Sequence, residues 1–245
     1  QGRGLGAAIV FPLECSVTNL QHGARGRYIA GDMQLPAPKE GEAGVILITL
    51  AAAYCPVHGT NPRKATSSAF RAAENDVANG VLRIVDRCST SGRALLLGTD
   101  ANAIHSPLDT WSTSAEPREA SCLSRWIAAG LRDAFRALHP DLRVVTHYAT
   151  SGSGASRLDY ILSTSPHHVL PVAAAIHKEA TWPFDHHPVL VDYWGLTPPP
   201  RTAAYRFRLK WRHFLQKVEE ALSTAVSAEH FRSTIAASLP IDLPT

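Results

Sequence analysis

Apolar residues recur along this chain in two spacings, and each spacing predicts a different element. Short apolar or alternating runs between glycine, proline and polar residues are typical of strands, whereas apolar residues three and four positions apart are typical of helices. Strands are predicted at residues 7–11, 28–35, 45–54, 94–97, 144–148, 158–162, 169–176 and 188–193. Helices are predicted at residues 69–85, after an opening Asn61-Pro62 pair, and at residues 123–138. Many adjacent strands with two helices predict a mixed-sheet α/β sandwich flanked by helices.

A second region is predicted to begin after residue 196. Residues 197–201 read Thr-Pro-Pro-Pro-Arg, a stiff linker. Beyond it, apolar residues between Trp211 and Val226 trace one face of an amphipathic helix. We interpret this face as packing on the domain or on a downstream domain, since acidic residues interrupt the basic face that a membrane or calmodulin-like target would need. The predicted domains are therefore residues 1–196 and 197–245.

The composition suits a folded domain and excludes several classes of protein. Of 245 residues, 45% are hydrophobic and 18% charged, enough for a substantial core. A net charge of +3 permits nucleic-acid binding without requiring it. No apolar run approaches the roughly 20 residues of a membrane span. The four cysteines lie far apart, which predicts reduced thiols in an intracellular protein rather than a disulfide framework or a zinc site.

The chain begins with Gln1 and contains a single methionine, Met33. Translation is not expected to start at a glutamine. We therefore expect this sequence to be a piece of a longer polypeptide, and it shows no signal peptide.

Candidate chemistry first appears where the strand around residues 94–97 ends, in Gly98-Thr99-Asp100-Ala101-Asn102. Residues two apart on extended backbone point the same way, so Asp100 and Asn102 are predicted to face one pocket. Gly98 is predicted to allow a sharp turn where a phosphate approaches. An ordinary Asx-rich turn explains the pentapeptide equally well.

An acidic residue also interrupts the apolar strand at residues 158–162. Asp159 needs a partner there, or its pKa rises. His186 is the predicted partner, because a carboxylate behind an imidazole fixes the tautomer and favours the charged form used in acid–base chemistry. A structural pair of Asp159 with Arg157 is the disfavoured alternative.

The third cluster, Asp185-His186-His187-Pro188, precedes the last predicted strand. Asp185 offers an oxygen ligand for Mg²⁺, a hard ion that takes only one or two carboxylates. Tyr54 ends another strand, where its phenol would hydrogen-bond a phosphate oxygen or simply pack. Eight further histidines are assigned no role, with His105 kept in view for its closeness to Asn102: His105, His139, His147, His167, His168, His177, His213 and His230.

Taken together, these residues resemble the endonuclease/exonuclease/phosphatase superfamily, and within it the apurinic-endonuclease-like domain of non-LTR (LINE-type) retrotransposon polyproteins. The matching motifs are Tyr54-x-Pro56, Gly98-x-Asp100-x-Asn102 followed by Trp111, Ser156-Arg157-Leu158-Asp159-Tyr160, and Asp185-His186-x-Pro188. The resemblance covers residues 4–193, and the region beyond resembles, more weakly, the connector that precedes the reverse transcriptase.

The resemblance implies a four-layer α/β sandwich, with two mixed sheets flanked by helices, and Mg²⁺-dependent nicking of DNA, with Mn²⁺ as the alternative ion. Asp100 would orient or deprotonate the attacking water, and Asn102 would hold the scissile phosphate. His186, paired with Asp159, would stabilise developing charge, and Tyr54 would contact the phosphate. The metal ligands would be Asp185, Asp100 and Asn102. DNA would be the partner, in the nucleus, with a reverse transcriptase domain downstream.

Two departures from the family pattern bear on activity. The family opens with an Asn-bearing strand and a Gln-Glu pair whose Glu is the main metal ligand, and neither segment is present in these 245 residues. Glu14 lacks the matching context. Phe184 also stands where a small hydroxyl residue is usual. We therefore expect an N-terminally truncated domain that lacks its first strands, weak or inactive as it stands, from a parent nuclease.

Three alternatives remain at this point. A phosphatase or phosphodiesterase of the same fold would act on inositol phosphates or lipids, but the Ser-Arg-Leu-Asp run at residues 156–159 favours nucleic acid over the Trp-Cys-Asp-Arg-like block of those relatives. A non-catalytic remnant of a mobile element would explain the missing Glu segment. A DNA-binding module without chemistry lacks support, because no basic stripe or zinc spacing is present.

Overall fold

The computed structural model describes residues 7–9, 15–36, 45–57, 67–112, 117, 121–148, 154–164, 169–177 and 185–194. All of them belong to the first of two units, Gln1–Pro199 and Pro200–Thr245. The predicted linker and amphipathic helix, Asn61-Pro62, Glu14, Phe184 and part of the strand at 7–11 lie outside the described residues. Among the residues described, no helix combines the length and apolarity needed to cross a bilayer.

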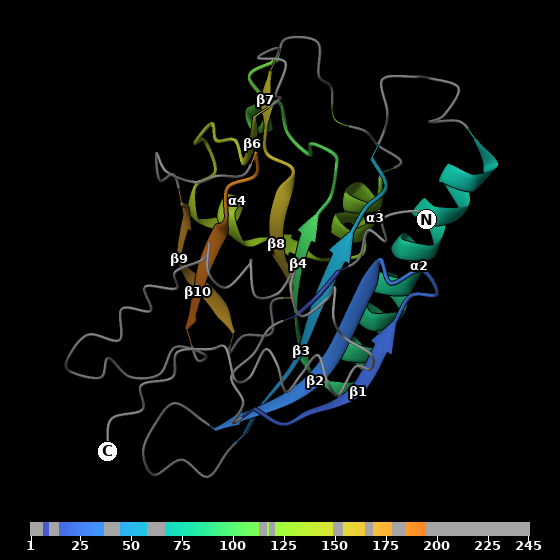
Figure 1. The fold of residues 1–245 in the computed structure, drawn as a ribbon. Coiled ribbons are helices and arrows are strands. Elements are labelled where there is room, and N and C mark those ends of the chain that lie inside the picture. Colours follow the sequence, from blue (N-terminus) through green and yellow to red (C-terminus); the bar gives the residue numbers. More distant parts are fainter. Residues whose placement is uncertain are drawn as a thin grey trace, which may run out of the picture. The chain divides into compact units, whose positions relative to one another are not determined.

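A six-stranded mixed sheet forms the centre of the domain (Figure 1). The strands, in spatial order, are β1 (Val17–His22), β2 (Tyr28–Pro36), β3 (Val45–Tyr54), β4 (Ala94–Asp100), β8 (Asp159–Ser163) and β5 (Arg132–Asp133). Neighbours are antiparallel except β3 and β4, which are parallel. The connection between these two passes through α2 (Ser68–Ser91), as parallel strands require a crossover.

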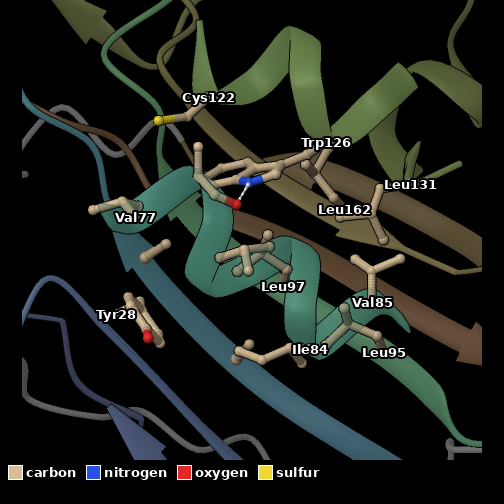
Figure 2. Close-up of a cluster of buried hydrophobic side chains, with 14 of the residues drawn as sticks. Tyr28, Val77, Ile84, Val85, Leu95, Leu97, Cys122, Trp126, Leu131 and Leu162 are labelled. Atoms are coloured by element: carbon tan, nitrogen blue, oxygen red, sulfur yellow. Dashed lines mark hydrogen bonds between the residues drawn. The ribbon is translucent and has the colours of Figure 1, made fainter. Parts of the chain in front are cut away.

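Alternation along the central strands gives the sheet two apolar faces. On β4, Leu95 and Leu97 belong to one buried cluster and Ala94 and Leu96 to the other. Helices α2 and α3 (Cys122–Ala128) cover the first face, where Figure 2 shows the Trp126 ring beside Leu162 and Leu131. The remaining labelled members of this cluster in Figure 2 are Tyr28, Val77, Ile84, Val85 and Cys122. The Trp126 indole Nε1 donates to the carbonyl oxygen of Ala78 at 3.3 Å, which satisfies a buried donor.

The opposite face packs against a second, two-stranded sheet. Strands β9 (Leu170–Ile176) and β10 (Val189–Trp194) pair antiparallel, and Tyr193 and Val169 join the cluster that contains Met33 and Ile48. In Figure 1 this pair lies on the side of the central sheet away from α2 and α3. A mixed α/β fold with helices is thus confirmed, while the second sheet, within the described residues, is an antiparallel pair where a mixed one was predicted.

The helix predicted at residues 123–138 is wrong as a single element. The chain forms α3, then the short strand β5, then α4 (Ala134–Leu138). Gly130 breaks the helix with a φ of +96°, a conformation that suits glycine. Asp133 then caps α4 by accepting the backbone N–H of Arg136 at 3.1 Å. Both short helices bury apolar residues, α3 with Trp126 in the first cluster and α4 with Ala134 in the second, but the apolar period does not register the interruption between them.

A close approach between α2 and β2 is set by a glycine. A Cβ on Gly80 would lie 2.3 Å from the Tyr28 ring, so only a hydrogen fits there. In an open helix Gly→Ala stabilises by about 1 kcal/mol.

We expect Gly80→Ala to destabilise the protein, because the added methyl group overpacks the contact with Tyr28. The free energy of unfolding should fall by about 1–3 kcal/mol. Urea denaturation of the variant measures this. Ser89→Ala, at an exposed position of α2, is the matched control and should change stability by less than about 0.5 kcal/mol. A stabilised Gly80→Ala protein would contradict the packing described.

Candidate active site

Three of the predicted site residues form a row across adjacent strands. Tyr54 at the end of β3 is paired in register with Asp100 at the end of β4, and Asp100 is paired with Asp159 at the start of β8. Directly paired residues point to the same face of a sheet, and this face also carries Leu96 and Ile161, on the β9–β10 side. Two motifs far apart in sequence therefore meet at one edge of the sheet.

Gly98 does not form the turn that was predicted for it. Strand β4 runs on through Gly98 to Asp100, and the turn comes at Asn102, whose φ of +46° lies in the left-handed region. Gly98 is exposed, and a Cβ there would meet nothing within 4 Å. The surface beside Asp100 is thus open on the face that carries the row.

Asn102 is held by an Asx turn of the kind given as the ordinary explanation. Its backbone N–H donates to Asp100 Oδ1 at 3.1 Å, and its side-chain Nδ2 donates to the carbonyl oxygen of Cys55 at 2.9 Å. The turn fixes the amide beside the end of β3, so it positions the very side chain that the functional interpretation requires.

His186 lies beside the row. Its Nδ1 is 2.8 Å from Asp159 Oδ2, a contact that orients the imidazole ring. Arg157 does not bind Asp159 and instead pairs with Asp109 and Asp133. The carboxylate oxygens of Asp100 and Asp159 and a ring nitrogen of His186 all lie within 4.8 Å of one another.

The segment that carries His186 is fixed by Thr146, a residue that sequence reasoning missed. The His187 N–H donates to the Thr146 carbonyl at 2.6 Å. The Thr146 hydroxyl accepts from the N–H groups of Leu158 and Asp159 at 3.0 and 3.1 Å. One threonine therefore ties the start of β8 to the loop before β10. A buried hydroxyl in a predicted strand carries no motif that would have revealed this.

His147 also belongs to the site, although no role was assigned to it. It pairs with His186 in an isolated β-bridge, and the two ring centroids are 4.7 Å apart. Its Nε2 lies 3.8 Å from Asp185 Oδ2. Within the part of the chain that the structure describes, Asp185 therefore clusters with His147 and His186, whereas Asp100 clusters with Asp159 and His186. The predicted metal ligands Asp100 and Asp185 do not share a cluster.

Trp111 lies close to this region and is 53% exposed. Its ring meets Tyr148 edge to face at 6.4 Å, and Tyr148 in turn meets His187 at 5.4 Å. The Tyr148 N–H donates to the Asp185 carbonyl at 3.1 Å. An aromatic group thus borders the His147–Asp185 side of the site.

Burial and neighbouring charge shift the pKa values of the site in a consistent pattern. Burial, followed by the charge of Asp159, raises the pKa of Asp100 to about 6. The hydrogen bond that the His186 ring donates to Asp159 raises the pKa of His186, whereas burial and the charge of His186 lower the pKa of His147. Burial and Asp100 raise the pKa of Tyr54. A carboxyl that titrates near neutrality beside an imidazolium suits proton transfer.

The donor set fits a hard divalent cation. Two neighbouring carboxylates, Asp100 and Asp159, with the amide of Asn102 two residues on, supply the oxygen ligands that Mg²⁺ and Mn²⁺ prefer. The raised pKa of Asp100 shows that its negative charge is not fully compensated by the protein. A bound cation would supply that compensation.

Comparison with known proteins agrees with this fold. The sequence model of the endonuclease/exonuclease/phosphatase family matches residues 2–186. A 3′ phosphatase, NExo from Neisseria, bound to a product DNA hairpin, is 18% identical over 73% of this chain and 72% of that chain, with a TM-score of 0.55. No curated protein matches the sequence.

Two further solved structures are similar to a comparable degree. The 3′-5′ exonuclease NExo from Neisseria meningitidis is 20% identical over 74% of this chain and 72% of that chain, with a TM-score of 0.53. An AP endonuclease from Archaeoglobus fulgidus is 18% identical over 73% and 72%, with a TM-score of 0.51. At these identities the likeness concerns the fold.

The raised pKa of Asp100 makes a prediction about stability. The folded-state pKa of about 6 lies above the ordinary 3.8. The stability contributed by protonated Asp100 is therefore fully present below about pH 4 and is lost as the pH rises through 6. We expect Asp100→Asn to be more stable than the wild type at pH 8, on the order of 1–3 kcal/mol, with no advantage below pH 4.

Urea denaturation at both pH values tests this. Asp192→Asn, at an exposed carboxylate on β10, is the control and should show no such pH-dependent gain. Equal stability of the wild type and Asp100→Asn at pH 8 would contradict the conclusion that the charge of Asp100 is not fully compensated in the folded protein.

Proposed function

The chain belongs to the endonuclease/exonuclease/phosphatase family, and on this premise we propose that it hydrolyses phosphodiester bonds in DNA with the help of a divalent cation. The observation that carries the proposal is the position of Asp100 beside the Asp159–His186 pair, with donor atoms within 4.8 Å. This group combines a base near its pKa at neutral pH with an imidazole that favours its charged form.

In the proposed reaction, Asp100 orients a water molecule and accepts its proton. The water oxygen forms a bond to phosphorus, and the bond to the leaving sugar oxygen breaks. His186 contacts the phosphate through Nε2, because Nδ1 is held by Asp159, and its positive charge stabilises the negative charge that develops on the oxygens. Asp159 is a positioning residue, since it fixes the tautomer and orientation of the ring.

Asn102 and Tyr54 complete the proposed phosphate site. The Asx turn holds the Asn102 amide in place before substrate binds, so little entropy is lost on binding. The Tyr54 ring lies 5.4 Å from the Arg27 guanidinium, which holds the phenol at the end of β3. Both side chains would contact phosphate oxygens.

The cation, Mg²⁺ or Mn²⁺, would be held by oxygen atoms of Asp100 and Asn102. When bound, it supplies a positive charge that polarises the phosphate. Asp185, the third ligand that the family resemblance implied, is 54% exposed and clusters with His147 and His186.

DNA is the proposed substrate for two reasons. The Ser-Arg-Leu-Asp run at residues 156–159 favours nucleic acid over small phosphate esters, and similar folds include an AP endonuclease and a 3′ phosphatase bound to a DNA hairpin. The finer form of the proposal is nicking by the endonuclease domain of a LINE-type retrotransposon. It includes a four-layer sandwich, action in the nucleus and a reverse transcriptase downstream, and rests on the sequence resemblance.

Nicking of supercoiled plasmid by the 245-residue chain, with Mg²⁺ or Mn²⁺, tests the proposal, and we expect a low wild-type rate because the Gln-Glu segment of the family pattern is not among these residues. We expect His186→Ala, Asp100→Asn and Asp159→Asn each to reduce the rate by about 100-fold or more, since acid–base and electrostatic groups contribute on this scale. Chelation of the cation should abolish nicking in all of them.

His22→Gln, on the edge strand β1, is the matched histidine control and should nick at the wild-type rate. Undiminished nicking by His186→Ala would overturn the proposed roles. Absence of nicking by the wild type, with release of phosphate from a 3′-phosphorylated oligonucleotide, would assign a phosphomonoesterase. Absence of both activities would favour the non-catalytic remnant.

A further inference from the structure

His186 also belongs to a second cluster of ligating groups. We propose that His147, Asp185 and His186 form a binding site for a borderline transition-metal ion of the Zn²⁺ class, separate from the oxygen-rich site at Asp100. The ligating atoms of the three side chains lie within 4.8 Å of one another. Two imidazoles and one carboxylate are a donor set found in zinc sites that keep an open position.

The ring of His186 is prepared for this role. Its Nδ1 lies 2.8 Å from Asp159 Oδ2, a contact that orients the ring within the cluster. A carboxylate behind a metal-bound imidazole fixes the ring orientation and raises the basicity of the ligand. Asp159 therefore serves as the outer partner of this site as well as of the proposed catalytic group.

The second imidazole is equally constrained. The backbones of His147 and His186 pair in a β-bridge, and their rings lie 4.7 Å apart between centroids at an angle of 53°. His147 Nε2 is 3.8 Å from Asp185 Oδ2. Two ligands of a tetrahedral zinc ion are about 3.3 Å apart, given metal–ligand lengths near 2.0–2.1 Å. A side-chain movement that brings Asp185 Oδ2 about half an ångström closer to His147 Nε2 would reach this distance.

Solvent can reach the cluster. The side chains of His147, His186 and Asp185 are 25%, 33% and 54% exposed. An ion can therefore enter without opening the fold, and a fourth position remains for water. Because the three residues come from two backbone segments already paired together, little ordering is needed when the ion binds.

The chemistry separates the two sites by ion type. Imidazole nitrogens favour Zn²⁺, Ni²⁺ and Cu²⁺, whereas Mg²⁺ prefers carboxylate, amide and water oxygens. His186 is shared by both clusters. Occupation of Nε2 by zinc removes the group proposed to contact the phosphate, so zinc would inhibit the Mg²⁺-dependent reaction. Zinc binding itself stands without the proposed function, but this inhibition rests on it.

Metal binding is tested first, on the 245-residue chain without Mg²⁺. Titration with Co²⁺ should give the intense visible absorption of a four- or five-coordinate ion at one equivalent, and Zn²⁺ should displace it. His147→Phe keeps a ring against His186 but removes the ligand, and we expect at least tenfold weaker Co²⁺ binding. His22→Gln should bind as the wild type does, and circular dichroism confirms that each variant is folded.

Asp185→Asn is a second variant, which weakens the site without changing the shape of the side chain. Unchanged Co²⁺ affinity in both His147→Phe and Asp185→Asn would overturn the site. A wild-type Co²⁺ spectrum typical of a six-coordinate, water-ligated ion would also overturn the proposed site.

Inhibition is tested in the plasmid assay. Micromolar Zn²⁺ should slow wild-type nicking at fixed Mg²⁺, and His147→Phe should need at least tenfold more Zn²⁺ for the same effect. Equal inhibition of both proteins would overturn the competition between the sites. If no protein nicks DNA under any condition, the proposed function fails, while the Co²⁺ titration still decides the metal site.

Discussion

The buried guanidinium of Arg157 is the constraint on which the site depends. It is 1% exposed, its Nε donates to Asp109 Oδ1 at 2.9 Å, and it also pairs with Asp133. A buried charge without partners is strongly destabilising, so these acids must stay where they are. Arg136 adds a 2.6 Å contact to Asp109, and the charges of the two arginines lower the pKa of Asp109 although burial alone would raise it.

This ion cluster joins three parts of the chain. Asp109 follows the turn that carries Asn102, Asp133 begins α4, and Arg157 stands two residues before Asp159. The Arg157 N–H donates to the Asp109 carbonyl at 2.6 Å, and its guanidinium stacks on Tyr160 at 4.3 Å. These contacts hold the end of β4 next to the start of β8 from the buried side. They thereby fix the distance between Asp100 and Asp159, which lie at those two strand ends.

The sequence predicted those elements whose own residues decide them. Apolar or alternating runs predicted β2, β3 and β8, and the helical period predicted α2, because the residues of each element decide which side it buries. It did not predict the interruption at Gly130 or the role of Asp133, since that acid pairs with Arg157, 24 residues further along the chain. Likewise Asp100, Asn102 and Asp159 stand at strand ends recognisable by motif, whereas His147 and Thr146 join the site only through long-range pairing with the His186 segment.

The site also carries a charge imbalance that its own fold maintains. Antiparallel pairing of β4 with β8 places Asp100 directly opposite Asp159, and like charges opposite each other in a sheet are destabilising. His186 offsets one of these charges through its contact with Asp159, which leaves Asp100 with its raised pKa. Since the Arg157 cluster prevents the strands from separating, the repulsion cannot be relieved by a shift of the backbone. It can be relieved by a proton or by a cation, and these are the two species that the proposed hydrolysis would bring to this position.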